Sequence, residues 1–304
     1  MSVPRVTQRL MTERILHDLR VQTHRLLRVQ TQLATGQRIN APSDDPIDAR
    51  RAIDTRTIIQ KYRQYIDNIA MLRPQLEETT SCVGNAMNIV QRANELTLQG
   101  ANGTNAQEQM NYIAEEVNQL IEGMLVNANH MTNGRYIFSG TRTGTPAFSA
   151  TRDAAGEITA VTYQGDGQSI EMALSDNVRL ACNEPGDQVF QSTIDIFQTL
   201  IGIRDDLRAG DQASLSNVHL AELEQARAQL SQAQARIGAL QNRVLNAENE
   251  NEDLVLQNQI LLSQIMDADF AETIVNLNVQ QNAYQAALNA AARILQPSLL
   301  DFVR

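Results

Sequence analysis

The sequence predicts a mainly α-helical protein: the N- and C-terminal segments form an elongated antiparallel helical bundle or coiled coil, and a small β-rich insert interrupts it. A row of apolar side chains from Leu223 to Ala268 keeps alternating steps of three and four residues, which is typical of a long packed helix. The chain has no Trp and only 4% aromatic residues, a composition that favours helices joined through aliphatic side chains. Seven of the 15 glycines fall between residues 134 and 186, where short β-type runs also occur.

We expect five segments along the chain. They are an N-terminal axial helix with its cap (1–45), a helical rod segment (46–133), the β-rich insert (134–188), a long helical rod segment (189–266) and a C-terminal axial helix (267–304).

The first segment begins with one amphipathic helix, predicted over residues 7–35. Its apolar side chains repeat at heptad spacing in Leu19, Leu26 and Leu33. Gly36 follows the last of them, and a glycine is the residue that most readily adopts the left-handed conformation at the end of a helix. We therefore expect the helix to end there.

The turn that follows contains residues suited to begin a second helix. Ser43, Asp44 and Asp45 have side chains that can accept hydrogen bonds from backbone N–H groups at a helix start. Pro46 fits the first helical position, where no N–H donor is needed. The second helix should therefore begin at Pro46.

The second helix is expected to contain one apolar row from Tyr62 to Ala93, with Pro74 inside it. An interior proline removes a backbone hydrogen bond, so we expect a kink there rather than a local break. Thr104 and Gln107 have the spacing of a capping box, which predicts the start of a third helix.

The insert should consist of short strands that rest on the neighbouring helices, because it is too small for a core of its own. The expected strands are residues 135–139, 158–163 and 170–174, and Gly165-Asp166-Gly167 is the predicted hairpin turn between the last two.

Helical pattern returns around Phe190 to Leu207 and then over a long run from about Leu215 to Met266. The phase of the apolar row changes at Asp267-Ala268-Asp269, which predicts a joint between two helices. The pattern does not decide whether these rows pack within the chain or between chains. The residues that we assign to the seam are Leu230, Ile237, Leu240, Val244, Leu254, Leu261, Phe270, Ile274, Leu277, Leu288 and Leu295.

Charge and composition exclude several classes of protein. The net charge of −10 and the pI near 4.9 argue against a nucleic-acid partner, which would require a basic face. Residues 1–40 contain seven Arg against two acidic residues, whereas residues 211–304 contain five Arg against eleven, so the two ends should attract each other. No run of 18 apolar residues is present, which excludes a membrane span and a Sec-type signal. Cys82 and Cys182 are too few for a disulfide framework.

Two groups of side chains contain residue types that can bind metal ions. Asp267, Asp269 and Glu272 lie close in sequence, but positions i and i+2 of a helix point to different sides, so a capping role is favoured. His17 and His24 share a helix face without a Cys or carboxylate at ligand spacing. We therefore predict no metal site and no bound cofactor.

No catalytic constellation is visible either. Asp44 and Asp45 could be imagined as a general acid and base, but capping explains both. The sequence thus predicts a protein that is not an enzyme.

Two stretches resemble the signatures of the flagellin superfamily. The N-terminal stretch is Gln32–Asn40 followed by Pro42–Pro46, and the C-terminal stretch is Asp267–Glu272 together with the tail Ile294–Phe302. The tail adds Leu299, Leu300 and Phe302 to the expected seam. A soluble coiled-coil adaptor would explain the heptads but not these stretches. The positions that match the family motifs are Arg38, Asn40, Pro42, Ser43, Asp44, Asp45, Pro46, Asp267 and Asp269.

Within that superfamily, three features resemble the members that join hook to filament more than a short flagellin that forms the filament itself. They are the Pro42–Pro46 motif, Tyr136–Gly140 followed by Thr145–Phe148, and Leu299–Phe302. The resemblance implies an extracellular structural subunit that self-assembles in a ring or helical layer, exported by a type III route without a cleaved Sec signal. The partners it implies are hook-associated protein 1, flagellin and an export chaperone.

Overall fold

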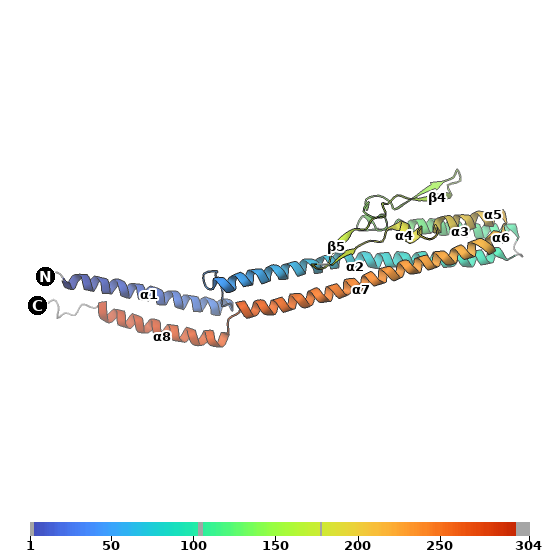
Figure 1. Ribbon diagram of the computed structural model, residues 1–304. Helices are drawn as coiled ribbons and strands as arrows, with labels where there is room; N and C mark the ends of the chain where they lie inside the picture. The colour runs from blue at the N-terminus through green and yellow to red at the C-terminus, as the bar shows by residue number, and fades with distance from the viewer. Residues whose placement is uncertain (1–2, 103–105, 177, 296–304) are drawn as a thin grey trace. The chain divides into compact units, whose positions relative to one another are not determined.

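The computed structural model describes residues 3–102, 106–176 and 178–295, and the chain divides into two compact units. Unit 1 contains Met1–Lys61 and Leu254–Arg304, so it is built from both ends of the chain; unit 2 is the continuous stretch Tyr62–Asp253. The long helices that contribute to them are labelled in Figure 1.

The predicted mainly α class, with long helices at both ends and small sheets between them, is confirmed. The helices are α1 (Val3–Thr35), α2 (Pro46–Ala101), α3 (Gln107–Ala128), α4 (Gly186–Phe190), α5 (Ile196–Ala209), α6 (Gln212–Ser214), a π-helical turn (Leu215–His219), α7 (Leu220–Met266) and α8 (Phe270–Leu295). The strands are β1 (Met131–Thr132), β2 (Arg135–Tyr136), β3 (Phe148–Arg152), β4 (Ile158–Tyr163), β5 (Glu171–Ala173) and β6 (Arg179–Ala181).

α2 begins at Pro46 as predicted and continues through Pro74 without a break. In unit 2 its apolar row is buried from Ile69 to Ala93. The predicted capping box at the start of α3 is wrong. The N-cap is Ala106, which makes no side-chain cap, and Thr104 lies outside the described residues. The amide of Gln107 instead donates to the carbonyl oxygen of Arg208 at 2.8 Å, at the end of α5.

The strands form three two-stranded antiparallel sheets, β1–β2, β3–β4 and β5–β6. The predicted hairpin between residues 158–163 and 170–174 is therefore wrong, because β4 pairs with β3 and β5 pairs with β6. Asp166 of the expected turn accepts a hydrogen bond from the backbone N–H of Thr141 at 2.8 Å, which ties this loop to another part of the insert. The expected strand 135–139 is shorter, since β2 ends at Tyr136.

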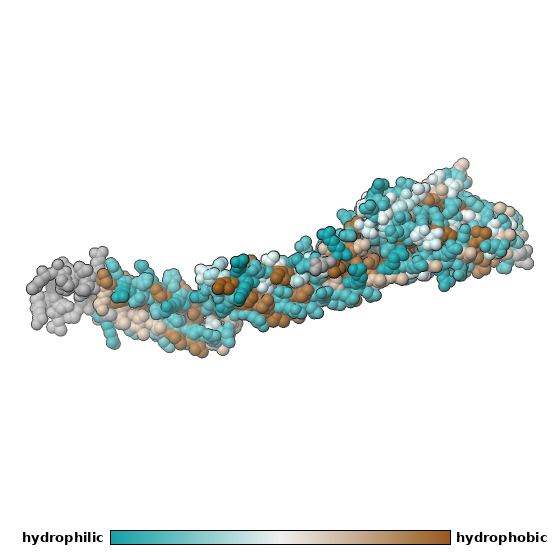
Figure 2. Space-filling view, viewed as in Figure 1, coloured by the Kyte–Doolittle hydropathy of each residue, from teal (hydrophilic) through white to brown (hydrophobic). Residues whose placement is uncertain are grey.

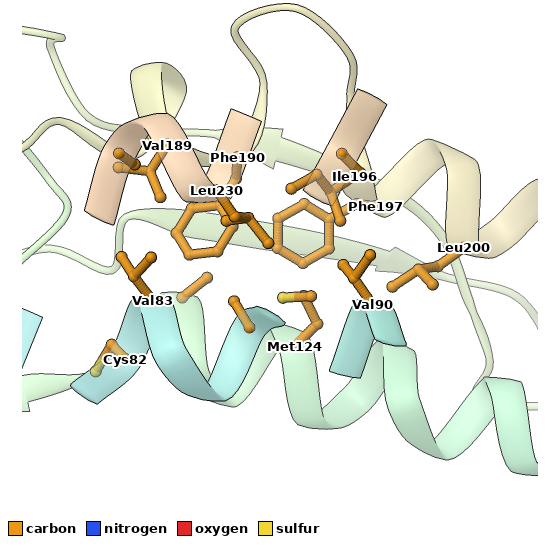
Figure 3. Close-up of a cluster of buried hydrophobic side chains, with 14 of the residues drawn as sticks. Cys82, Val83, Val90, Met124, Val189, Phe190, Ile196, Phe197, Leu200 and Leu230 are labelled. Carbon is orange, nitrogen blue, oxygen red and sulfur yellow. The ribbon is translucent and has the colours of Figure 1, made fainter. Parts of the chain in front are cut away.

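The core of unit 2 contains an aromatic cluster to which the insert contributes. Phe148 of β3 lies with its ring centroid 5.6 Å from that of Phe190 and 5.2 Å from that of Phe197. Figure 3 shows Phe190 and Phe197 between α4 and α5 on one side and the apolar side chains of α2 and α3 on the other, with Leu230 of α7 beside them. The expectation that the insert rests on neighbouring helices is confirmed, because its own side chains complete this core.

The helix predicted around Phe190 to Leu207 is two helices, α4 and α5. Asp195 begins α5, because its carboxylate accepts hydrogen bonds from the backbone N–H groups of Phe197 and Gln198 at 3.0 and 3.1 Å. α7 has 47 residues and matches most of the predicted long run. The apolar row of α7 from Leu223 to Val244 is buried in the core of unit 2. This part of the row therefore packs within the chain and not between chains.

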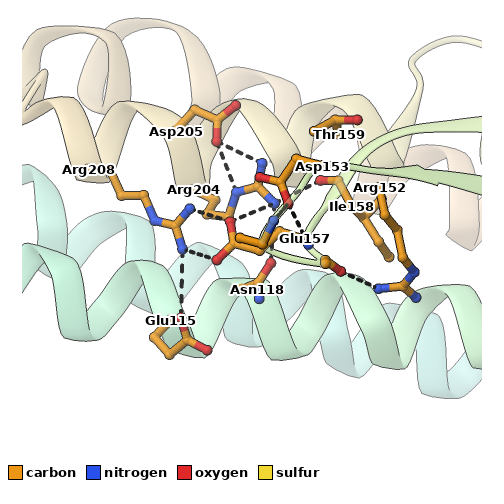
Figure 4. A network of polar contacts seen from close by, with 12 residues as sticks. Glu115, Asn118, Arg152, Asp153, Glu157, Ile158, Thr159, Arg204, Asp205 and Arg208 are labelled. Atoms are coloured by element: carbon orange, nitrogen blue, oxygen red, sulfur yellow. Dashed lines mark hydrogen bonds and ion pairs between the residues drawn. The ribbon is translucent and has the colours of Figure 1, made fainter.

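One buried guanidinium ties the insert to the helices of unit 2. Arg204 of α5 is 3% exposed, and its Nη1 donates to the carbonyl oxygen of Ile158 at 2.8 Å and to Oδ1 of Asn118 at 3.2 Å. Arg208, one turn later, binds Glu157 at 2.7 Å and lowers the pKa of that carboxyl group (Figure 4). Through these contacts β4 is held against α3 and α5.

Both cysteines are buried in unit 2 as free thiols. Burial raises the pKa of Cys82 and of Cys182 to about 11, so neither is a reactive thiolate at neutral pH.

Candidate assembly interface

The two sequence motifs, more than two hundred residues apart, meet in unit 1. Gln37 and Asp267 form an isolated antiparallel bridge. The backbone N–H of Arg38 donates to the carbonyl oxygen of Met266 at 2.6 Å, and that of Ala268 donates to the carbonyl oxygen of Gly36 at 2.9 Å. Gly36 has φ +70°, as the predicted end of α1 requires. The motifs therefore form one joint, at which α1 ends and α8 begins.

Arg38 is the central polar side chain of this joint. Its Nη2 lies 2.7 Å from Oδ2 of Asp48 and 2.9 Å from the carbonyl oxygen of Ile265. Its Nη1 contacts Oδ2 of Asp45 at 3.4 Å. The hydrogen bond to Asp48 is the main reason that the pKa of Arg38 is raised. Arg38 thus links the start of α2 to the end of α7.

Asp45 caps the start of α2, as predicted. Its Oδ1 accepts from the backbone N–H groups of Asp48 at 3.1 Å and Ile47 at 3.2 Å, and these bonds, led by that from Asp48, lower its pKa. Asp44 accepts from the N–H groups of Asn40 at 3.1 Å and Ala41 at 3.0 Å and so closes the preceding loop.

The remaining motif residues lie around this loop and at the start of α8. Ser43 is exposed, Pro42 lines a small pocket of about 100 Å³ that Ile39 also lines, and Pro46 is the first residue of α2. Asp269 caps α8, because its Oδ1 accepts from the N–H of Ala271 at 2.8 Å.

Asp267 is the first acidic position of the C-terminal motif, and its carboxylate accepts a hydrogen bond from the hydroxyl of Ser263. Within the described ranges no group of three His, Cys, Asp or Glu side chains is placed to hold a metal ion. Among the described helices, none is both long enough and apolar enough to cross a membrane.

α1 and α8 lie side by side and run antiparallel within unit 1. On α1 the expected residues Leu19, Leu26 and Leu33 are half-buried. On α8 the predicted seam residues divide into two sets. Leu277 lies in the packed row together with Thr273, Gln280, Tyr284, Ala287 and Ala291, whereas Phe270, Ile274 and Leu288 are 55%, 47% and 43% exposed. Heptad spacing alone does not separate the two sets, because α8 has apolar side chains on more than one face.

The other seam residues fall into three groups. Leu230, Ile237 and Val244 are buried in unit 2, while Leu240 and Leu254 are half-buried. Leu261 is 46% exposed, because its neighbour Leu262 packs against the small core of unit 1 instead. The side chain of Leu295 and the tail residues Leu299, Leu300 and Phe302 lie outside what the structure describes.

The packed pair leaves a large amount of apolar surface in water. The seam predicted from the sequence omits part of this surface, because that seam contains a single row of side chains on each helix. Figure 2 shows apolar side chains gathered over α8. Large apolar side chains that remain exposed in this number are typical of an interaction surface in soluble proteins. The exposed apolar residues of the pair are Leu10, Met11, Leu16 and Leu27 on α1 and Phe270, Ile274, Val275, Val279 and Leu288 on α8.

Among the described residues of the pair, two amide oxygens lack a hydrogen-bond donor, Oε1 of Gln22 on α1 and Oε1 of Gln280 on α8. A buried acceptor without a donor costs roughly 1–3 kcal/mol. We therefore expect Gln22→Leu to stabilise the pair by about 1 kcal/mol, measured as slower amide hydrogen exchange in α1 and α8. Gln30→Leu, at an exposed position of α1, is the matched control and should change little. Faster exchange in the Gln22 variant would contradict the view that Oε1 of Gln22 is a buried acceptor whose loss stabilises the pair.

Two family models match the chain. That of the bacterial flagellin N-terminal helical region covers residues 7–143, and that of the bacterial flagellin C-terminal helical region covers residues 220–303. Together they cover most of the sequence, and each includes one of the two motifs that meet at the joint.

Two curated relatives are similar over most of their length. The chain is 26% identical to flagellar hook-associated protein 3 of Escherichia coli over 85% of this chain and 87% of that protein. It is 24% identical to flagellar hook-associated protein 3 of Salmonella typhimurium over 99% of this chain and all of that protein (100%).

Solved structures share the fold. A putative flagellar hook-associated protein from Vibrio parahaemolyticus superposes with a TM-score of 0.67 at 17% identity, covering 74% of this chain and 100% of that one. The flagellar junction protein of Legionella pneumophila gives a TM-score of 0.59 at 17% identity, covering 71% of this chain and 99% of that one.

Proposed function

The chain belongs to the bacterial flagellin family, and from that membership we propose that it is a structural subunit of the flagellum that joins the hook to the filament. Support comes from the two relatives named flagellar hook-associated protein 3, one of which matches over its whole length. A solved structure with the same fold is described as a flagellar junction protein.

The observation that carries this proposal is the apolar surface that α1 and α8 leave uncovered. Phe270, Ile274 and Val279 are about half exposed in the single chain, and an assembly in which they pack against neighbours would remove them from water. The five segments that the sequence predicts (1–45, 46–133, 134–188, 189–266 and 267–304) remain our proposed division, with the first and last as the axial parts.

The proposed partners are other copies of this chain, hook-associated protein 1, flagellin and an export chaperone. We further propose that the chain is exported by a type III route without a cleaved Sec signal, lies outside the cell, and acts by assembly rather than by catalysis. These points rest on the family resemblance.

A short flagellin that forms the filament itself is the second candidate, because the matching family models are those of flagellin. Loss of the gene separates the two. A junction subunit occupies one zone between two other components, whereas a flagellin repeats the same contact along an open polymer.

We expect cells without the gene to make hooks, to lack attached filaments and to release unassembled flagellin into the medium, measured by electron microscopy and by blotting of the medium. Complementation should fail with Ile274→Asp, which places a charge on the exposed apolar row of α8, and succeed with Asn276→Asp, an exposed control on the same helix. Filaments of normal length without the gene, or the chain spread along the whole filament, would refute the junction role.

A further inference from the structure

The two units carry opposite net charge. Unit 2 contains twelve Arg against 25 Asp and Glu, a net charge of −13, whereas unit 1 contains thirteen Lys and Arg against ten Asp and Glu, a net charge of +3. Unit 2 of one copy therefore repels unit 2 of another, while unit 1 of one copy attracts unit 2 of another. Charge alone favours contacts between unlike units of neighbouring copies.

The positive charge of unit 1 includes an exposed surface on α1. Arg14, Arg20 and Arg25 are exposed, and in the described part of the chain no ion pair forms at these guanidinium groups. α1 packs on α8 through the row of Leu19 and Leu26, so these cations remain free for another partner.

Apolar side chains accompany these cations. Leu10 and Leu27 are 60% and 52% exposed, and His17 and His24 are exposed beside them. The surface thus combines hydrophobic contact area with unpaired positive charge.

α7 carries the complementary surface within unit 2, over Leu245–Asp253. Glu250, Glu252 and Asp253 are exposed, and among the described residues none of them takes part in an ion pair. The neighbouring Glu248 is bound to Arg73 at 3.2 Å. Leu245, 50% exposed, is the apolar member of this surface.

We propose that α1 of one copy docks on the acidic segment Leu245–Asp253 of α7 of a second copy. The guanidinium groups of Arg14, Arg20 and Arg25 would lie against the carboxylates of that segment, with Leu10 or Leu27 covering Leu245. The two surfaces are different, so each copy uses one of each, and the contact repeats from copy to copy as a ring or helical layer requires.

This inference deepens the proposed function, since it names the faces through which the subunits of the assembly meet. A contact between exposed charges is screened by salt, because the Debye length falls from about 30 Å at 0.01 M to about 3 Å at 1 M ionic strength. The docking should therefore weaken strongly with salt.

Carbodiimide cross-linking of the full chain tests the contact, because it joins an amine to a carboxylate and Lys61 is the single lysine of the sequence. Arg20→Lys places an amine on α1. An equal mixture of ¹⁵N-labelled and unlabelled chains should then give links from position 20 to Glu250, Glu252 or Asp253 that join a labelled to an unlabelled peptide in mass spectrometry. Their yield should fall about threefold or more between 0.01 and 0.5 M salt.

Arg63→Lys, at an exposed position of α2 in unit 2, is the matched control and should give no such links.

A second experiment uses charge reversal and measures self-association by sedimentation at low salt. Arg14→Glu, Arg20→Glu and Arg25→Glu together should abolish self-association. Mixing that chain with one that has Glu250→Arg, Glu252→Arg and Asp253→Arg should restore it.

Links within one chain only, no links between copies, or no rescue on mixing would overturn the proposal. The junction role would remain supported after any of those outcomes, provided that deletion of the gene yields hooks without filaments. Normal filaments in the deletion strain would refute the junction role whatever the cross-links show.

Discussion

Ile237→Asp is expected to destabilise unit 2 more than any other single change that we propose. Ile237 is fully buried in the row of α7 that packs in the core of unit 2. The change removes a buried apolar side chain and places a carboxylate among the apolar side chains of the core, at a cost of at least about 4 kcal/mol. Domains of this kind have a free energy of unfolding of roughly 5–15 kcal/mol in total, so a large part of the stability would be lost.

The measurement is urea unfolding followed by helical circular dichroism. Gln234→Asp introduces the same residue at an exposed position on the same helix, and it should lower the free energy of unfolding by no more than about 1 kcal/mol. Equal unfolding midpoints for the two variants would show that the row of α7 is not the core of this unit.

Arg204→Met should cost about 3 kcal/mol, the second largest effect that we expect. Methionine fills similar space but leaves the carbonyl oxygen of Ile158 and the amide oxygen of Asn118 without their donor, and both lie in the buried part of the network. The loss should appear as a lower unfolding midpoint together with weaker protection of β4 in hydrogen exchange.

Arg208→Met is the matched control, because Arg208 lies one turn away in α5 and binds Glu157 next to the partners of Arg204, but its side chain is 36% exposed. A partly solvated ion pair contributes about 1 kcal/mol or less. An equal loss of stability in the two variants would show that the burial of Arg204 is not the cause of its larger contribution.

The features that the sequence predicted well are those with a local cause. Gly36 ends α1 because of its freedom at positive φ, and Asp45 with Pro46 begins α2 because one caps and the other needs no donor. The break before α8 follows from the change of phase at Asp267, and Asp269 supplies the cap there. Each of these signals lies within a few residues of its effect.

The features that were missed depend on contacts distant in sequence. β4 pairs with β3 rather than with β5, and nothing in the short run at 148–152 distinguishes it as a strand. The burial of Arg204 depends on Ile158 and Asn118, which lie on other elements. On α8, two apolar faces satisfy the same spacing, so only the position of α1 determines which face is packed.

The bridge between Gln37 and Asp267 also bears on the order in which the chain can fold. Every contact between α1 and α8 joins residues from opposite ends of the sequence, so unit 1 has no nucleus of its own in either half of the chain. Closing so long a loop is slow compared with local contacts. Unit 2 is one continuous stretch, so it can acquire structure before the last residues of the chain are made, whereas unit 1 can form only once both ends are present.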